Sequence, residues 1–178
     1  MKEEINRRLL ENKSLWEEIN QQTTLFLSLF TELSNQYNQE RLTSIFPFAK
    51  GCKVTKGLQL EGYPYQVLDL IRDFDPDSGF NIRILNWWGH GLYLLVLGGR
   101  DFGGRLIEFN LSHTSSFSIS QDFDVWNYKK ILHPVREKNY TKVHESLQIF
   151  KKIELPDTAT QLQVVLSKEI DRILEYPW

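Results

Sequence analysis

The chain has 178 residues, of which 41% are hydrophobic and 25% are charged. This composition excludes a wholly disordered chain and is sufficient for a single domain with one buried core. Lys and Arg number 21 against 23 Asp and Glu, so the formal net charge is −2. That balance argues against a protein that binds nucleic acid through bulk positive charge.

The sequence favours a cytoplasmic protein without a membrane partner. Charged residues dominate the first eight positions, so the apolar core of a signal peptide is missing there. The apolar stretch 25–30 is too short to cross a bilayer. The single cysteine, Cys52, excludes an intramolecular disulfide and a cysteine-based zinc site, and it fits a reducing compartment. No two of the four histidines are spaced as a metal-ligand pair, so we expect no metal and no cofactor.

Residues 1–40 are predicted to be helical, with one long helix at about 15–38. No Gly or Pro occurs before Pro47, and Ser14 with Glu17 matches a capping box, which predicts that the helix begins at Ser14. The apolar positions at helical spacing are Leu15, Ile19, Phe26, Leu29, Phe30, Leu33 and Tyr37. This apolar band is wide, so we expect the helix to pack on more than one neighbour.

Residues 58–128 are predicted to form an antiparallel sheet of about 4–6 strands. Apolar runs at 65–74, 80–88 and 92–97 are separated by the turn signals Asp-Pro-Asp-Ser-Gly and Gly-His-Gly. Such short turns force neighbouring strands to be antiparallel. Apolar and polar residues alternate over 105–111, which predicts a further, half-exposed strand.

The chain is expected to be one α+β domain over residues 1–178. An apolar stripe at helical spacing predicts a C-terminal helix over 157–175. Strands grouped in the middle, with helices at both ends, favour α+β over an alternating α/β arrangement. Residues 140–154 fit either a helix or a strand.

The first candidate site lies on the hairpin around Asp77. If the hairpin is centred on that residue, Ile71 lies opposite Arg83. Asp69 and Asp73 then flank the Arg83 guanidinium on one face of the sheet. Further members of that face are Tyr65, Val67 and Trp87. Two carboxylates around a guanidinium can orient a polar ligand, although an ion-pair cluster on a half-exposed sheet is the commoner arrangement.

The second candidate site is the segment Trp87-Trp88-Gly89-His90-Gly91. Adjacent strand residues point to opposite faces, so one tryptophan enters the core and the other is left over. A tryptophan beside a histidine at a glycine-flanked turn can form one wall of a pocket, to which Tyr93 is added as a neighbour. The alternative is a tight hairpin in which tryptophan only fills the core.

Two further segments were weighed as anion-binding elements. The loop 98–104 holds four glycines around Arg100, but its spacing is not that of a phosphate-binding loop, and a flexible hairpin loop is the preferred interpretation. Residues 129–152 are rich in lysine with aromatic residues nearby. Because no recognised motif accompanies them, they do not make nucleic acid an expected partner.

No motif identifies a reaction or a ligand, and three hypotheses remain. The leading one is a non-catalytic ligand-binding or regulatory domain whose aromatic-lined pocket takes a small molecule. The alternative is a protein-interaction module, a homodimer that uses the apolar band of the N-terminal helix. The third is an enzyme in which Asp69, Asp73 or His90 serves as an acid or a base.

Overall fold

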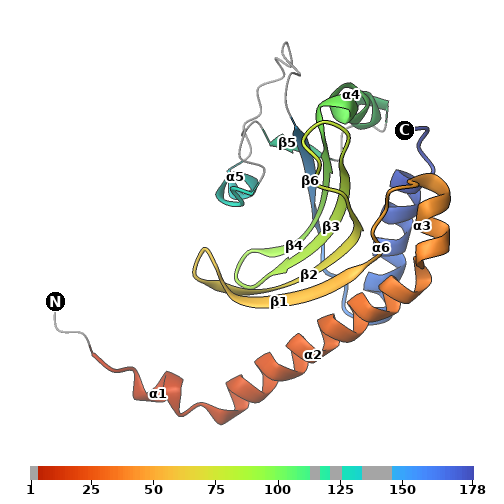
Figure 1. Ribbon diagram of the computed structural model, residues 1–178. Helices are drawn as coiled ribbons and strands as arrows, with labels where there is room; N and C mark the ends of the chain where they lie inside the picture. Colours follow the sequence, from red (N-terminus) through yellow and green to blue (C-terminus); the bar gives the residue numbers. More distant parts are fainter. Residues whose placement is uncertain (1–3, 113–116, 121–125, 134–145) are drawn as a thin grey trace.

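The computed structural model describes residues 4–112, 117–120, 126–133 and 146–178. It confirms the α+β class: one strongly curved, six-stranded antiparallel sheet is flanked by a long N-terminal helix and a C-terminal helix (Figure 1). The strands, in the order in which they lie in the sheet, are β1 (Lys53–Leu60), β2 (Tyr63–Arg72), β3 (Phe80–Trp87), β4 (Gly91–Gly98), β6 (Leu147–Ile153) and β5 (Ser118–Ser120). The helices are α1 (Arg7–Leu10), α2 (Lys13–Gln36), α3 (Gln39–Ile45), a 3-10 turn η1 (Arg100–Phe102), α4 (Gly103–Ser112), α5 (Lys129–Leu132) and α6 (Ala159–Leu174).

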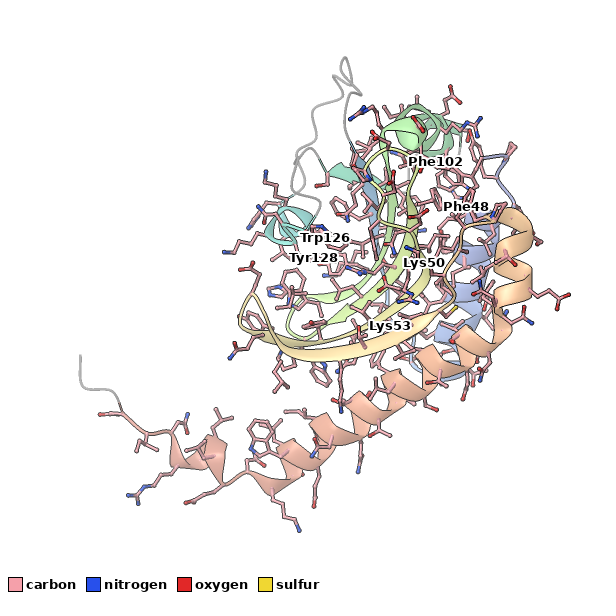
Figure 2. All side chains as sticks on the ribbon, in the orientation of Figure 1. Phe48, Lys50, Lys53, Phe102, Trp126 and Tyr128 are labelled. Atoms are coloured by element: carbon pink, nitrogen blue, oxygen red, sulfur yellow. The ribbon has the colours of Figure 1, made fainter. Side chains whose placement is uncertain are left out.

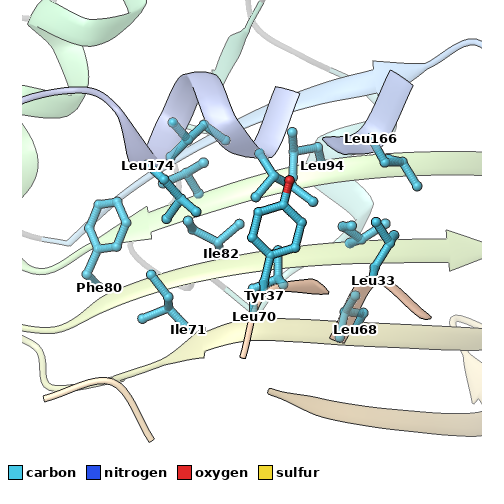
Figure 3. Packing of buried hydrophobic residues seen from close by; sticks show 14 of the residues in the cluster. Leu33, Tyr37, Leu68, Leu70, Ile71, Phe80, Ile82, Leu94, Leu166 and Leu174 are labelled. Atoms are coloured by element: carbon cyan, nitrogen blue, oxygen red, sulfur yellow. The ribbon is translucent and has the colours of Figure 1, made fainter. Parts of the chain in front are cut away.

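The larger hydrophobic core lies on the face of the sheet that α2 and α6 cover, which we call the outer face (Figure 1). Figure 3 shows side chains of β2, β3 and β4 packed against Leu33, Tyr37 and Leu166 from these two helices. Strand β4 is a continuous apolar run because both faces of the sheet are covered there. The opposite face of the sheet, which we call the inner face, carries a smaller cluster of buried residues. There Trp87, Tyr93 and Leu95 pack against Ile131 of α5 and against Tyr128, the residue before α5.

Helix α2 packs against the rest of the protein through its C-terminal half only. Its buried residues are Leu29, Phe30 and Leu33, and Tyr37 follows at the C-cap. The helix begins two residues earlier than the capping-box pattern predicts, because Asn12, rather than Ser14, is the N-cap and its side chain accepts a hydrogen bond from the Leu15 amide at 3.0 Å. The Ser14 hydroxyl instead donates to Glu18, at 3.4 Å.

The predicted register of the β2–β3 hairpin is wrong. On the turn side Ile71 pairs with Ile82, one residue from the predicted partner. A β-bulge between Asp69 and Ile71 adds a second residue to the shift, so that Arg83 pairs with Asp69. The turn itself lies where the sequence predicts it, and the Asp75 carboxylate accepts hydrogen bonds from the amides of Asp77 and Ser78.

The predicted strand over 105–111 is also wrong, since these residues belong to helix α4. Leu106, Phe109 and Asn110 are buried at helical spacing, and Phe109 packs edge-on against Phe117 and Tyr176. The alternation of apolar residues over this stretch is compatible with both periods, and the packing against the C-terminal segment selects the helix. Of the stretch left open, the described part, from Leu147 onward, is strand β6.

Candidate functional site

Most of the residues predicted for the site do meet on the inner face. Asp69 and Arg83 lie directly opposite each other on β2 and β3, and Tyr65 lies opposite Trp87 four residues away. The Arg83 guanidinium makes two hydrogen bonds to the Asp69 carboxylate, from Nε at 2.7 Å and from Nη2 at 3.0 Å. The third arm of the fork donates to the hydroxyl of Tyr128.

The ion pair is shielded rather than open to a ligand. The rings of Trp126 and Phe74 lie within 5.1 and 5.9 Å of the Arg83 guanidinium, and they contact each other edge-on at 5.3 Å. Figure 2 places Trp126 and Tyr128 beside α5, on the inner side of the curved sheet. Both carboxylate oxygens of Asp69 thus accept hydrogen bonds from Arg83, and aromatic rings cover the guanidinium.

The electrostatics of this cluster favour its charged form. Burial opposes the charge on Arg83, but the hydrogen bond and the charge of Asp69 outweigh that cost, so the pKa of Arg83 rises above its ordinary value. Burial raises the pKa of Tyr128, and the adjacent guanidinium offsets only part of that increase. Tyr128 thus stays a neutral hydroxyl that accepts from Arg83, which is a structural role.

Asp73 does not join this cluster. It follows the end of β2 beyond the bulge, and its carboxylate accepts a hydrogen bond from the Asp75 amide at 3.3 Å. It lines a different cavity, described below. The predicted arrangement of two carboxylates around one guanidinium is therefore absent, and a single carboxylate faces Arg83.

The two adjacent tryptophans point to opposite faces, as alternation in a strand requires. Trp87 is fully buried on the inner face and donates its indole N–H to the Leu60 carbonyl at 3.0 Å. Trp88 is half-buried, and its indole N–H donates to the side-chain oxygen of Gln66 at 3.1 Å. The same oxygen accepts a hydrogen bond from the side-chain amide of Asn86 at 2.7 Å. Trp87 is thus core, and Trp88 belongs to a polar network on the other side of the sheet.

His90 and Tyr93 do line a hollow of about 520 Å³ on the inner face, between β4, β6 and α5. His90 is packed against the rings of Trp87 and Tyr63, at 4.2 and 4.7 Å between ring centres. The Tyr93 hydroxyl donates to the backbone carbonyl of His90, at 3.2 Å. The ammonium of Lys152 lies 5.8 Å from the Tyr93 ring. This hollow has mixed polar and apolar walls, and only Tyr93 and His90 come from the predicted set.

The structure contains a second cavity that no sequence motif indicated, which we call the aromatic pocket. It encloses about 380 Å³ between the segment after α3, the β2–β3 turn, η1 and the C-terminal residues. Its five aromatic side chains are Phe46, Phe48, Phe80, Phe102 and Trp178. Phe80 is the centre of the set: it stacks on Phe46 at 4.5 Å and 12° and contacts Trp178 at 4.7 Å and Phe102 at 5.1 Å.

Two loops are locked together to form one wall of this pocket. The Gly99 amide donates to the Gly79 carbonyl at 2.8 Å, and the Asp101 amide donates to the Asp77 carbonyl at 2.9 Å. A methyl group at Gly99 would lie 2.5 Å from that Asp77 oxygen, so the close approach of the two backbones requires glycine. The loop predicted to be a flexible hairpin connection instead consists of the 3-10 turn η1 and the start of α4, and these hydrogen bonds hold it to the β2–β3 turn.

The mouth of the aromatic pocket is charged. Asp73, Asp101 and Arg105 line it beside Ser78, and Asp101 and Arg105 are exposed. Phe48, at the rim, is 82% exposed, which is unusual for a phenylalanine in a folded domain (Figure 2). Two carboxylates and one guanidinium give the mouth a net negative charge.

The described parts of the chain contain no group of three His, Cys, Asp or Glu side chains that could hold a metal ion, and no helix long and apolar enough to cross a membrane. A third hollow, of about 930 Å³, is lined by charged residues of α6 that include Lys168, Glu169 and Asp171. The Cys52 thiol is half-buried and donates to the Tyr37 carbonyl at 3.3 Å, and burial raises its pKa, which keeps it protonated. Residues 134–145, half of the lysine-rich stretch 129–152, lie outside the described residues.

Comparisons with known proteins supply no relative from which a function could be taken. No protein-family model matches the chain, and neither a curated protein nor a solved structure matches it. A functional assignment must therefore rest on the geometry of the cavities.

Proposed function

We propose that this protein is a non-catalytic ligand-binding domain whose aromatic pocket takes a small planar aromatic molecule. The observation that carries the proposal is the convergence of five aromatic side chains, from segments far apart in the chain, around a cavity of about 380 Å³. Cavities of roughly 300–1,000 Å³ with mostly apolar walls and a few polar groups are typical of small-molecule sites.

The shape of the pocket favours a flat ligand. The Phe46 and Phe80 rings are stacked and nearly parallel, and Trp178 meets Phe80 at 55°, so flat aromatic surfaces make up much of the wall. Offset-stacked and edge-on contacts with such faces stabilise an aromatic guest by roughly 0.5–1.5 kcal/mol beyond simple burial. The guest would lie over the hydrophobic floor with its polar end at the mouth.

The charge at the mouth favours a ligand that carries a basic nitrogen. Asp73 and Asp101 outnumber Arg105, and carboxylates and a guanidinium at the rim orient a ligand more than they add affinity. Tryptamine and indole-3-acetate share one ring system and differ in the sign of their charge. We expect tryptamine to bind more tightly than indole-3-acetate, and we expect Asp101→Asn to reduce the difference.

The experiment is a titration of the full chain with each of the two probes, in which binding is monitored by amide NMR shifts and by calorimetry. Binding at the proposed site shifts the Trp178 indole N–H, which donates to the Ile173 carbonyl at 2.7 Å and so gives a local reporter. Phe48→Ala should weaken binding several-fold, because this ring lines the rim, while leaving the unfolding midpoint unchanged, because it is so exposed. The matched control is Leu58→Ala, a 79% exposed apolar residue on β1 that does not line the pocket.

The proposal fails if neither probe, nor a panel of neutral bicyclic aromatics, shifts resonances around Phe80 and Trp178. It also fails if Phe48→Ala and Leu58→Ala affect binding equally. Shifts confined to His90 and Tyr93 would instead favour the hollow on the inner face.

The enzyme hypothesis has less support from the geometry. Asp69 is held by Arg83, Asp73 lies apart from it in the aromatic pocket, and His90 is packed between two rings. These three residues do not converge on a common point where a substrate could sit.

A further inference from the structure

The N-terminal part of the chain forms an arm that projects from the body, defined here as residues 5–25 (Figure 1). No described residue before Leu29 is buried. Ile5 is 77% exposed, and Leu9, Leu10 and Trp16 are also largely exposed. Isolated helices of about 12–15 residues are marginal in water, and apolar side chains in such a helix gain stability only when another surface covers them.

The sequence of the arm is symmetric about Asn12. Ile5, Leu9, Leu15 and Ile19 stand at equal distances on the two sides of it, so the pattern reads I-x-x-x-L-x-x-N-x-x-L-x-x-x-I in both directions. Spacings of three and four residues are those of an apolar seam between two helices. Leu15 and Ile19 lie half-buried on α2, Leu9 lies on α1, and Ile5 lies just before α1. Asn12 is also where α1 ends and α2 begins, with its side chain capping α2.

The charges of the arm are complementary under the same symmetry. Arg7 and Glu17 stand at equal distances from Asn12, and so do Glu11 and Lys13. In two arms that run antiparallel and cross at Asn12, Ile5 therefore faces Ile19 and Leu9 faces Leu15. Arg7 then faces Glu17 and Glu11 faces Lys13, whereas a parallel pair would set like charges opposite each other at these positions.

We propose that residues 5–19 form an antiparallel pair with the same segment of a second copy of this chain, with the two-fold axis at Asn12. The self-complementary order of apolar and charged residues selects a second copy over an unrelated partner. It also selects one register, because a shift along the seam would misalign both the apolar and the charged pairs. The two bodies then lie at opposite ends of the paired arms, with each aromatic pocket outside the interface.

The first test is sedimentation of the full chain over a wide concentration range. We expect a monomer–dimer equilibrium that Leu15→Glu weakens by about tenfold or more, which corresponds to about 1.4 kcal/mol or more. The matched control is Leu111→Glu, which places the same charge at an exposed apolar position on α4, outside the arm. A monomer at every concentration would overturn the proposal, and so would a dimer that Leu15→Glu leaves intact.

Charge exchange tests the register. Arg7→Glu alone should weaken the dimer, because the new glutamate of each copy then faces Glu17 of the other copy. The two-fold symmetry places this repulsion at two positions of the dimer. The double variant Arg7→Glu with Glu17→Arg should restore the dimer, since the opposite pairing is then re-formed between copies. Failure of the double variant to recover association would exclude this register.

A cysteine on the axis gives a direct readout. In a Cys52→Ala background, Asn12→Cys brings two thiols together at the two-fold axis and should yield a covalent dimer on mild oxidation. Gln21→Cys, an exposed position of α2 away from the axis, should cross-link far less. Equal cross-linking of both variants would indicate random collision and would contradict the proposed arrangement. If the chain instead stays monomeric and the arm binds lipid vesicles, the arm is a membrane-surface helix and the proposal is wrong.

Discussion

Asp69 and Arg83 face each other across β2 and β3 and form a two-pronged ion pair that Tyr128 completes. Their side chains are 8% and 14% exposed, so the pair is largely withdrawn from water. A charge pair in that position is costly to form and costly to break, since removal of one partner leaves the other buried and unpaired.

Arg83→Met should therefore destabilise the protein by about 3–5 kcal/mol, because it leaves the Asp69 carboxylate buried without its partner. Denaturant unfolding measures this loss. Arg100→Ala is the control, because Arg100 and Asp77 form an ion pair at 3.1 Å with side chains that are 60% and 56% exposed. We expect it to cost less than about 1 kcal/mol. Similar losses in the two variants would show that burial of the Asp69–Arg83 pair has no special importance.

Tyr37 makes the protein sensitive to alkaline pH. Its hydroxyl donates to the Asp171 carboxylate at 2.8 Å, and burial together with this hydrogen bond raises the pKa of Tyr37 well above its ordinary value of 10.0. The folded state therefore keeps the proton that the unfolded state loses, so its contribution to stability is complete below pH 10 and falls as pH rises above it. Tyr37→Phe should cost about 1–2 kcal/mol at pH 7. The variant should also lose part of the alkaline slope, and an unchanged slope would contradict this account. Cys52, Tyr93 and Tyr128, whose pKa values burial also raises, contribute to the remainder.

The contact between the two pocket loops predicts opposite effects for two glycines. Gly99→Ala should destabilise the protein by about 1–3 kcal/mol, because the added methyl meets the Asp77 backbone at 2.5 Å. Gly104→Ala, in α4, meets nothing within 4 Å and should be neutral or stabilising by up to about 1 kcal/mol. Thermal unfolding compares the two variants directly. Equal tolerance of both would mean that the loops can separate, and the aromatic pocket would then not be preformed.

The adjacent tryptophans should also differ. Trp87→Ala removes a fully buried ring and an indole hydrogen bond, and should cost about 3–5 kcal/mol. Trp88→Ala removes a half-buried ring and should cost about 1–2 kcal/mol, since Gln66 keeps its hydrogen bond to Asn86. Unfolding curves for both variants settle the order. If Trp88 were the more costly position, the assignment of the two faces would be reversed.

Local patterns in the sequence predict the elements well where one period dominates. The long helix, the turn at Asp75 and the continuous apolar run of β4 all follow from residue types at fixed spacing. The strand predicted over 105–111 fails because its apolar positions fit both periods, and the decision comes from Phe109 packing against residues near the C-terminus. No local signal carries that information.

The candidate sites show the same limit more sharply. Asp69 and Arg83 share a face as predicted, but the bulge that makes them direct partners depends on how the whole sheet curves. The aromatic pocket was missed because Phe46, Phe80, Phe102 and Trp178 are distant in the chain and each is an ordinary core residue by itself. Only the contact between the two glycine-containing loops brings their elements together.

Strand β1 is the first strand of the sheet, and no described strand pairs with its other edge. Strand β1 contains Lys53 and Lys56 (Figure 2 labels Lys53), and its pairing with β2 shifts between Gly57 and Leu60. Lysines and irregular pairing make such an edge a poor template for further strands. The open edge of β1 therefore disfavours open-ended, amyloid-like stacking, and the antiparallel pairing of two arms proposed above would likewise be closed at two copies.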